Sequence, residues 1–398
     1  MSNHLEQEIV NEYTRIKEIL YSTYPEAKTS DQSTYKSILK ESKFKMFLKI
    51  LMGLLNSNVS EKEYLVLGLR EKSFLTSLPR KKTVLIAKNL SEVLFAIKER
   101  YSFYYLGLAE YKVIEAYFER DPSKLIGILV KILRLVDKLK KPGFIFYFTD
   151  VAPMEIIFRI ISNQNEGLFT ICLQHGVLLE VNQEFILEGS LSDYFLSNGE
   201  EQKRIASRLL GEKTKIFDMG PAYEFPIIKD EGPLDIILVT NGGADVDLKR
   251  SSLTNRILNQ LSKRLEVHSI KFSIKLHPSD QPISFEAKEN LYNGTKYDVL
   301  SNKPKVFIGF VSTLLYEAHL IGHTSVEIRL RNEKLELNCE QLNTFTPDYS
   351  FFDDELDLLC NELKELDCIK KKEVESFKTL PLKERVYDSI TRIEEGIK

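Results

Sequence analysis

Short apolar runs alternate with longer amphipathic segments along most of the chain. Each run has the length of a buried strand, and each following segment carries its apolar residues at helical spacing. Strands that alternate with helices in this way predict a parallel sheet with helices on both faces. In the first half of the chain the predicted strands are Thr83–Ala87, Phe103–Leu108, Phe144–Asp150, Phe169–Val177, Asp193–Ser197 and Lys215–Gly220.

A second series of the same kind begins after residue 234. Pro221, Pro226, Gly232 and Pro233 interrupt the stretch between the two series, so a linker is predicted at residues 221–234. The chain is therefore predicted to hold two α/β domains. In the second half the predicted strands are Asp235–Thr240, Phe272–Leu276, Tyr297–Leu300, Val306–Phe310 and Ser325–Arg329.

Helical patterns dominate both ends of the chain. Residues 1–75 are predicted to be helical, and the strongly apolar run 44–55 carries Lys45 and Lys49. Such a helix either packs on the first domain or lies against a membrane surface or an acceptor. Segment 123–141 leaves a similar choice, because a basic amphipathic helix either covers a sheet or rests on an anionic membrane. A last helix is predicted at Leu382–Ile397.

Composition narrows the classes of protein that fit. With 398 residues the chain has room for two ordinary domains. Its net charge of −3 argues against a nucleic-acid-binding protein, so no nucleic acid is expected as a partner. The four cysteines have no paired spacing, and neither zinc nor a disulfide framework is indicated. No secretory signal is expected in the charged residues 1–11, and no apolar run reaches the roughly 18–20 residues that span a bilayer. These features predict a cytoplasmic protein.

Two predicted strand ends carry polar residues suited to an anion. Pro278 ends the strand after His277, and ligands of parallel sheets bind outside the carboxyl ends of strands. At the next strand end, Ser312 and Thr313 coincide with the start of a helix, whose first N–H groups favour anions. A phosphate held between the two is one interpretation. The other is that His277 is a turn residue and Ser312-Thr313 a simple helix cap.

Lys275-Leu-His-Pro278 followed by Ser312-Thr313 resembles the His-Pro and Ser/Ser-Thr motifs of bacterial sialyltransferases, polysialyltransferases and related capsule glycosyltransferases. It is also similar to the corresponding motifs of teichoic-acid polymerases. The resemblance covers the C-terminal half well and the N-terminal half loosely. It implies the GT-B fold, in which two Rossmann-like domains face each other across a cleft, here with added N-terminal helices.

The resemblance also implies that one domain binds the acceptor and the other binds the donor. We expect a helical segment at 1–75, an acceptor domain at 76–226, a donor domain at 227–370 and a C-terminal helix at 371–398 that crosses back to the first domain. Glu317 lies one helical turn after Thr313 and can face the same crevice. The expected donor-binding residues are Asn241, Gly242, Gly243, His277, Pro278, Ser312, Thr313 and Glu317.

The catalytic base is expected on the first domain. Gln174-His175-Gly176 follows a predicted strand and resembles the Trp-His-Gly or Gln-His-Gly element of capsule and teichoic-acid glycosyltransferases, where the histidine lies near the acceptor. A histidine with an ordinary pKa of about 6.5 suits this role. Asp150 is the second candidate, either as the base or as the group that orients the imidazole, and Glu180 is the third.

These features predict a glycosyltransferase of bacterial surface polysaccharide synthesis. The expected donor is a nucleotide-activated acidic sugar, CMP-linked, and the acceptor a glycan or lipid-linked glycan, which would bring the protein to the inner membrane as a peripheral partner. Asp245-Val-Asp247 does not end a strand, so no metal and no cofactor besides the donor are expected. The alternatives are a CDP-polyol phosphotransferase, a non-hydrolysing sugar-nucleotide epimerase and a non-catalytic subunit of the same fold.

Overall fold

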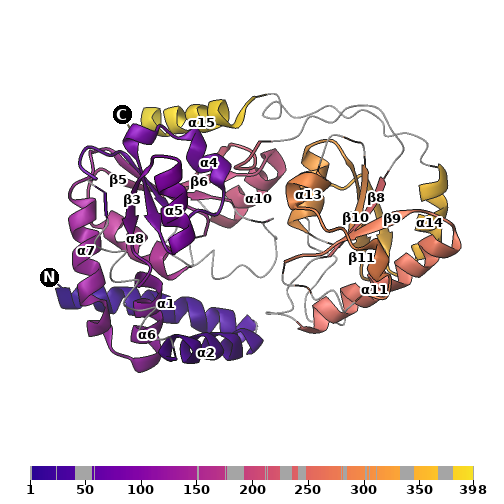
Figure 1. The fold of residues 1–398 in the computed structure, drawn as a ribbon, viewed down its shortest axis with the longest axis horizontal. Helices are drawn as coiled ribbons and strands as arrows, with labels where there is room; N and C mark the ends of the chain where they lie inside the picture. The colour runs from indigo at the N-terminus through magenta and orange to yellow at the C-terminus, as the bar shows by residue number, and fades with distance from the viewer. Residues whose placement is uncertain are drawn as a thin grey trace. The chain divides into compact units, whose positions relative to one another are not determined.

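The computed structural model describes residues 2–23, 25–40, 56–57, 59–149, 152–174, 176, 192–210, 212, 214–224, 235–240, 248–278, 280, 285–300, 303, 305–310, 312–331, 345–365 and 380–397. Across these residues the chain is an α/β protein with two parallel sheets, so the predicted fold class is confirmed. It divides into two compact units, whose elements are labelled in Figure 1. Unit 1 contains Met1–His175, Glu184–Tyr223 and Pro381–Lys398, and unit 2 contains Gly176–Gln183 and Glu224–Leu380.

The sheet of unit 1 has the strand order β3-β2-β1-β4-β5-β6-β7 within the described residues. This is the order of dinucleotide-binding Rossmann folds with one strand added at the edge, and the chain reverses its direction of progress between β1 and β4. The strands are β1 (Tyr64–Leu67), β2 (Thr83–Ala87), β3 (Ser102–Tyr105), β4 (Gly143–Tyr147), β5 (Leu168–Leu173), β6 (Tyr194–Ser197) and β7 (Lys215–Asp218).

Strand β1 corrects the expectation that residues 1–75 are all helical. It pairs in parallel with β2 and β4, with Tyr64 opposite both Thr83 and Phe144, and all four of its residues are buried. A strand buried on both faces is apolar throughout and lacks the alternation that separates a strand from a helix. The described helices of residues 1–77 are α1 (Ser2–Thr23), α2 (Pro25–Leu39) and α4 (Lys72–Ser77).

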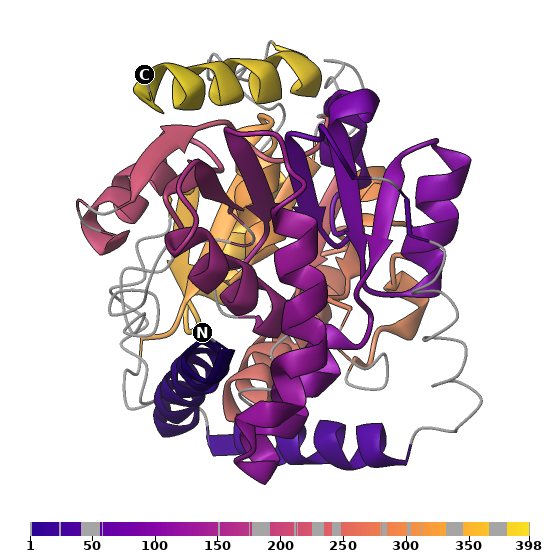
Figure 2. The same cartoon turned by 90° about the vertical axis from the view of Figure 1, so that its left-hand side faces the viewer.

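Helices cover both faces of this sheet. On one face α4, α5 (Leu90–Lys98) and α15 (Leu382–Ile397) share a core with Tyr64, Val66, Phe144 and Phe146. On the other, α1 packs with α6 (Ala109–Glu119), α7 (Ile126–Val136) and α8 (Pro153–Asn163). Figure 2 accordingly shows α15 (yellow) and α1 (indigo) on opposite sides of unit 1. Helix α10 (Glu200–Leu210) connects β6 to β7.

Helix α15 is fastened to unit 1 by a buried arginine. The guanidinium of Arg385 donates hydrogen bonds to the carbonyls of Met219, Pro221 and Tyr223 at 3.0, 2.8 and 2.8 Å. Arg385 is 3% exposed. The last helix therefore closes the core of unit 1 after the chain has passed through unit 2.

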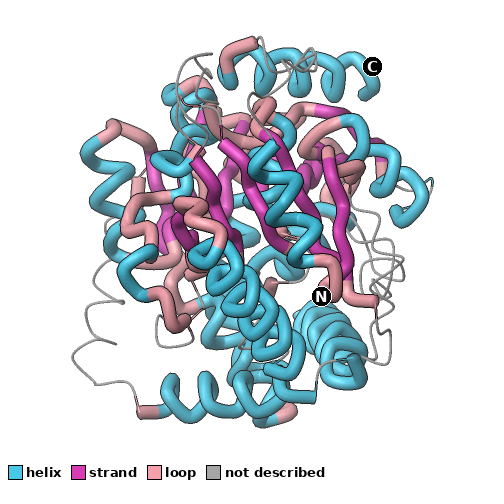
Figure 3. Tube along the Cα trace, turned by 90° about the vertical axis from the view of Figure 1, so that its right-hand side faces the viewer, coloured by secondary structure: helices cyan, strands magenta, loops and turns pink. Residues whose placement is uncertain are grey.

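Unit 2 contains the second parallel sheet, in the order β12-β11-β10-β8-β9. This is the flavodoxin-like order, in which the first strand of the unit, β8, lies between the second and the third. In Figure 3 strands (magenta) run side by side between helices (cyan), the layering of an α/β protein. The elements are β8 (Asp235–Val239), α11 (Leu248–Val267), β9 (Phe272–Lys275), α12 (Lys296–Val299), β10 (Lys305–Gly309), α13 (Thr313–Leu320), β11 (Thr324–Arg329), β12 (Tyr349–Phe352) and α14 (Leu356–Glu365).

The strand predicted at Tyr297–Leu300 is wrong, because these residues belong to α12 and the turn after it. Thr295 and Asp298 form a capping box, in which each side chain accepts a hydrogen bond from the other residue's main-chain N–H. Such reciprocal capping satisfies two donors at the start of a helix and favours the helix over a strand.

The amphipathic segment 123–141 covers the sheet. Its helix α7 buries Ile128, Leu129, Ile132, Leu135 and Val136, so its main apolar face is used inside unit 1. The other candidate for a membrane-surface helix, 44–55, lies outside the described residues. Among the helices that are described, none has the length and apolar character needed to cross a membrane.

Candidate functional site

Three neighbouring strands of unit 2 end at one edge of the sheet. Strand β8 pairs in parallel with β9 on one side and with β10 on the other, so the carboxyl ends of all three lie together. The chain passes from β8 to β9 and then crosses to the opposite side of β8 to form β10. This reversal between β8 and β10 is the topological switch point, where open α/β sheets bind their ligands.

The His-Pro turn follows β9 at this edge and is tied to the end of β8. The main-chain N–H of His277 donates to Thr240 Oγ1 at 2.7 Å, and Thr240 N–H donates to the carbonyl of Lys275 at 3.2 Å. The N–H of Asp280 closes the turn on the carbonyl of His277 at 2.9 Å. His277 and Pro278 are both exposed. The turn is therefore held through its backbone, while the side chains of His277 and Pro278 face solvent.

Helix α13 begins where β10 ends. Ser312 takes the N-cap position with extended backbone, and its side chain makes no capping hydrogen bond to the helix. Thr313 is the first helical residue, and both side chains are partly exposed. Gly309 permits the close approach of β10 to β8, since a Cβ atom there would lie 2.7 Å from the carbonyl oxygen of Val239. The helix start is thus placed at the switch point with hydroxyls not used for capping.

The carboxylate of Glu317 is turned into the unit. The residue is 3% exposed, and its Oε1 accepts a hydrogen bond from Lys296 Nζ on α12 at 3.1 Å. Glu317 therefore lies one turn into α13, as expected, and its buried carboxylate pairs with the partly exposed Lys296.

Asp280 is a residue at this edge to which the sequence pattern assigned no role. It is 7% exposed, and neither oxygen of its carboxylate has a hydrogen-bond partner among the residues that the structure describes. A buried carboxylate without partners is unfavourable. The only signal in the sequence is its position, three residues after His277 in the turn that leaves β9.

The remaining predicted residues lie outside the described part of the chain. These are Asp150, His175, Asn241, Gly242 and Gly243, together with Glu180, Asp245 and Asp247. The strands that precede two of them are neighbours, with Tyr147 of β4 opposite Cys172 of β5. Gly176 has a φ of 81°, a left-handed conformation that favours glycine, in agreement with the sharp turn expected there.

Unit 1 has its own switch point, between β1 and β4. Gly68 follows β1 with a φ of 72° and packs against Lys88, which follows β2. The carboxylate of Glu92 accepts hydrogen bonds from the N–H of Leu69 at 3.1 Å and of Lys88 at 2.6 Å. The residues after β1 and β2 are therefore fixed by one carboxylate at the carboxyl edge of the sheet.

A charge cluster around the buried carboxylate of Glu155 lies at the same edge. Lys88 Nζ is 3.0 Å from Glu155 Oε1 in the first turn of α8 and 2.7 Å from Glu110 Oε1 on α6. Burial raises the pKa of Glu155 although Lys88 opposes it. Burial alone lowers the pKa of Lys88, but Glu155 and Glu110 outweigh it and the net shift is upward. The second oxygen of Glu155, Oε2, is buried and has no hydrogen-bond partner in the described part of the chain.

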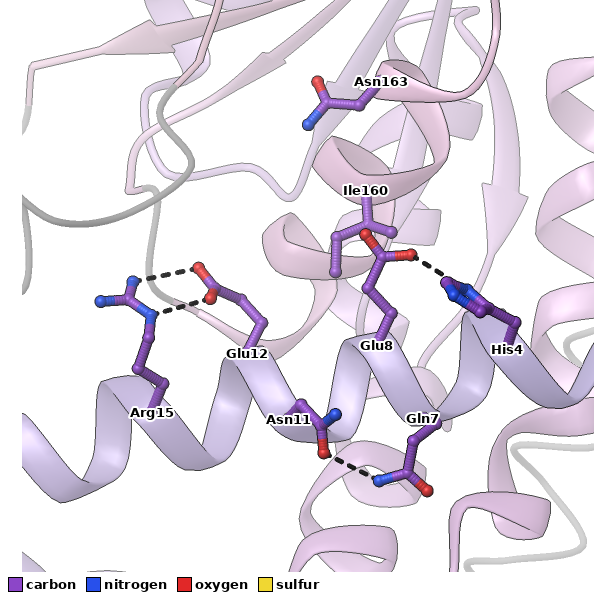
Figure 4. Close-up of a pocket in the computed structure, with 8 residues that line it drawn as sticks. All are labelled: His4, Gln7, Glu8, Asn11, Glu12, Arg15, Ile160 and Asn163. Atoms are coloured by element: carbon purple, nitrogen blue, oxygen red, sulfur yellow. Dashed lines mark hydrogen bonds and ion pairs between the residues drawn. The ribbon is translucent and has the colours of Figure 1, made fainter.

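A hollow of about 500 Å³ lies elsewhere on unit 1, between α1 and the last turn of α8 (Figure 4). Its polar side chains pair with each other: Arg15 with Glu12 at 2.9 Å, and Gln7 with Asn11 at 2.8 Å. Helix α8 starts after the carboxyl end of β4 and ends before β5, so this hollow lies toward the opposite edge of the sheet. It is lined by His4, Gln7, Glu8, Asn11, Glu12, Arg15, Ile160 and Asn163.

Comparison with known proteins gives only distant similarities. No family model and no curated protein matches the chain. A glycosyltransferase from Rickettsia africae ESF-5 aligns over 85% of this chain and 99% of its own at 10% identity, with a TM-score of 0.48. The wall teichoic acid polymerase TagF aligns over 88% and 94% at 12% identity, with a TM-score of 0.45. The alignment with the GtfA/B complex covers 69% of this chain at 11% identity, with a TM-score of 0.41. This chain spans about 60% of the length of that one. Similarity at this level does not identify an activity.

Proposed function

We propose that the protein is a nucleotide-sugar-dependent glycosyltransferase of bacterial surface polysaccharide synthesis, with its donor site on unit 2. The observation that supports this most is the strand order of unit 2. It brings the His277 turn and the start of α13 to the two sides of Thr240, at the switch point of the sheet. The same two motifs, in the same chain order, resemble those that bind donor phosphate in capsule glycosyltransferases.

The chemistry of this edge suits a nucleotide phosphate. A protonated His277 imidazole and the hydroxyls of Ser312 and Thr313 would donate hydrogen bonds to phosphate oxygens. The N-terminus of α13 adds main-chain N–H groups and the positive end of the helix dipole. These groups would stabilise the leaving nucleotide without a metal ion. We further propose a CMP-linked acidic sugar as the donor, on the motif resemblance alone.

The acceptor is proposed to bind unit 1. Its hydroxyl oxygen would form the new bond to the anomeric carbon of the donor as the bond from that carbon to the phosphate oxygen breaks. His175 would take the hydroxyl proton, with Asp150 orienting its imidazole or serving as the base itself. The nucleotide leaves with the electron pair of the broken bond.

Nucleotide binding tests the donor site directly. Titration calorimetry with CMP, CDP, UDP and GDP should show binding of a cytidine nucleotide, with the affinity reduced about 10–100-fold by His277→Ala through loss of a charge-assisted hydrogen bond. The matched control is His268→Ala, a partly exposed histidine of unit 2 that follows α11 and lies ahead of β9. Equal affinity of both variants would remove His277 from the site. Turnover of CDP-glycerol in place of a sugar donor would favour the polyol phosphotransferase instead.

A further inference from the structure

Helix α5 carries an apolar stripe on its outer side. Leu90, Leu94 and Ile97 are 53%, 57% and 56% exposed. Spacings of four and three residues place these side chains on one side of a helix. Val93 and Ala96 on the same helix are fully buried in the core of unit 1. The outer stripe is therefore not needed to hold the helix on the sheet.

This stripe differs from scattered surface hydrophobics. Within the described residues no other helix exposes three large aliphatic side chains; α7 comes next, with Ile126 and Val130 at 43% and 41%. Single exposed hydrophobics are ordinary, whereas adjacent ones mark contact surfaces.

Basic residues adjoin the stripe at the amino edge of the sheet, where the chain enters β1, β2, β3 and β4. Eight lysines and arginines stand there against four glutamates, Glu61, Glu63, Glu99 and Glu394, an excess of four positive charges. Lys98 directly follows Ile97, so the stripe runs into this basic edge. We define the basic edge as Lys62, Arg80, Lys81, Lys82, Lys98, Arg100, Lys140 and Lys141, of which all but the partly buried Lys62 are exposed.

The glutamates leave much of this charge unneutralised. Glu63 accepts from Lys82 and Lys140, each at 2.7 Å, and Arg80 lies 3.5 Å from Glu99. A hollow of about 400 Å³ opens in the same edge, lined in part by Lys82, Lys140 and Lys141. Glu63 and Glu394 also line this hollow, so its three lysines outnumber its carboxylates by one.

We propose that the α5 stripe and the basic edge together form a face that docks on an anionic lipid bilayer. Aliphatic side chains would enter the boundary between headgroups and acyl chains, and the lysines and arginines would meet the anionic headgroups. A symmetric contact between two copies is disfavoured, because it would pair one basic edge with another. The face takes no part in the proposed donor site, and its test needs no transferase activity.

Vesicle co-sedimentation tests this face. The wild-type chain should sediment with vesicles of phosphatidylethanolamine and phosphatidylglycerol at low salt, less at high salt, and not with phosphatidylcholine alone. Replacing Leu94 and Ile97 with Ser should lower the partition coefficient about tenfold. Lys81→Glu with Lys98→Glu should lower it at least as much and remove most of the salt dependence.

The matched control is the double variant Ile126→Ser and Val130→Ser on α7, which removes two exposed aliphatic side chains from the other side of the sheet and should bind like wild type. Circular dichroism checks that every variant is folded. The proposal would be overturned if the wild-type protein did not sediment with anionic vesicles at low salt. It would also be overturned if the α5 and α7 variants lost equal amounts of vesicle binding. A lipid-free dimer, seen by light scattering, that the α5 variant converts to monomer would overturn it too.

Discussion

The main-chain N–H of His277 donates a hydrogen bond to the side-chain hydroxyl of Thr240 at 2.7 Å, and this bond joins the ends of β8 and β9. Thr240 is 1% exposed. Its hydroxyl therefore fixes where the exposed His-Pro turn stands relative to the switch point.

Thr240→Val should loosen this turn, because a methyl group, which cannot accept a hydrogen bond, replaces the hydroxyl that accepts one from the His277 N–H. Leaving a partly buried donor unpaired costs up to about 1–3 kcal/mol, so the free energy of unfolding should fall by about 1 kcal/mol or more. Urea denaturation measures it. Thr240→Ser keeps the hydroxyl and is the control; if Ser and Val variants are equally destabilised, the loss comes from packing and not from the hydrogen bond.

His175→Ala should abolish most turnover while leaving donor binding intact. A general base contributes roughly 10²–10⁴-fold to the rate, whereas the proposed donor contacts lie on unit 2. Steady-state kinetics gives kcat, and calorimetry gives the donor affinity. Normal turnover in this variant, together with an inactive Asp150→Ala variant, would assign the base to Asp150.

Excess EDTA should not reduce activity. The donor groups proposed here supply hydrogen bonds and a helix N-terminus, and the sequence pattern does not predict Asp245-Val-Asp247 at a strand end. Initial rates before and after chelation, with magnesium or manganese added back, provide the measurement. A rate that falls on chelation and returns with the metal contradicts the metal-free proposal.

Arg385→Ala should destabilise unit 1 by about 3 kcal/mol or more, because three main-chain carbonyls lose their donors and a buried packing partner disappears. The control on the same helix is Arg392→Ala, whose exposed pair with Asp388 at 2.9 Å is worth less than about 1 kcal/mol. Urea denaturation compares the two. Similar losses in both variants would show that the buried guanidinium does not anchor α15.

Glu155→Gln should change stability in a pH-dependent way. Burial raises the pKa of Glu155 in the folded state, so this state binds more protons than the unfolded chain between the ordinary pKa and the raised one. Wild type should therefore gain stability, relative to the variant, as the pH falls through the folded pKa toward about 4.3. Unfolding free energies measured from pH 8 to pH 5 give the difference. A difference that stays constant, or grows in the variant's favour on acidification, contradicts the shift.

Most strands of both sheets could be predicted from the sequence, because their apolar runs are bounded by Gly, Pro or polar residues. Strand β2 was predicted at the residues it occupies, Thr83–Ala87, and β10 to within one residue at each end. The central strand β1 was missed because Tyr64–Leu67 is short, apolar on both faces and preceded by an apolar segment. Helix α12 was mistaken for a strand because its capping box was overlooked.

The candidate site of unit 2 was within reach of sequence reasoning because each motif sits where a predicted strand ends. Strand order alone decides whether the strand ends before His277 and Ser312 meet at one edge of the sheet, and parallel sheets restrict that order. The Lys88–Glu155 pair could not be predicted from the sequence, because its position depends on β1 and on the reversal between β1 and β4. Nothing local in the sequence marks Glu155 as a buried partner of a lysine 67 residues earlier.

The return of α15 to unit 1 sets the order in which the protein can be completed on the ribosome. Most of unit 2, from Glu224 to Leu380, is synthesised before Leu382, Val386, Ile390 and Ile393 emerge to fill the core of unit 1. At about 5–20 residues per second, the sheet of unit 1 waits on the order of ten seconds with the part of one face that α15 covers still open. During that interval its exposed apolar surface is a natural client for a chaperone, and a chain that stops short of residue 382 leaves the earlier unit, not the later one, incomplete.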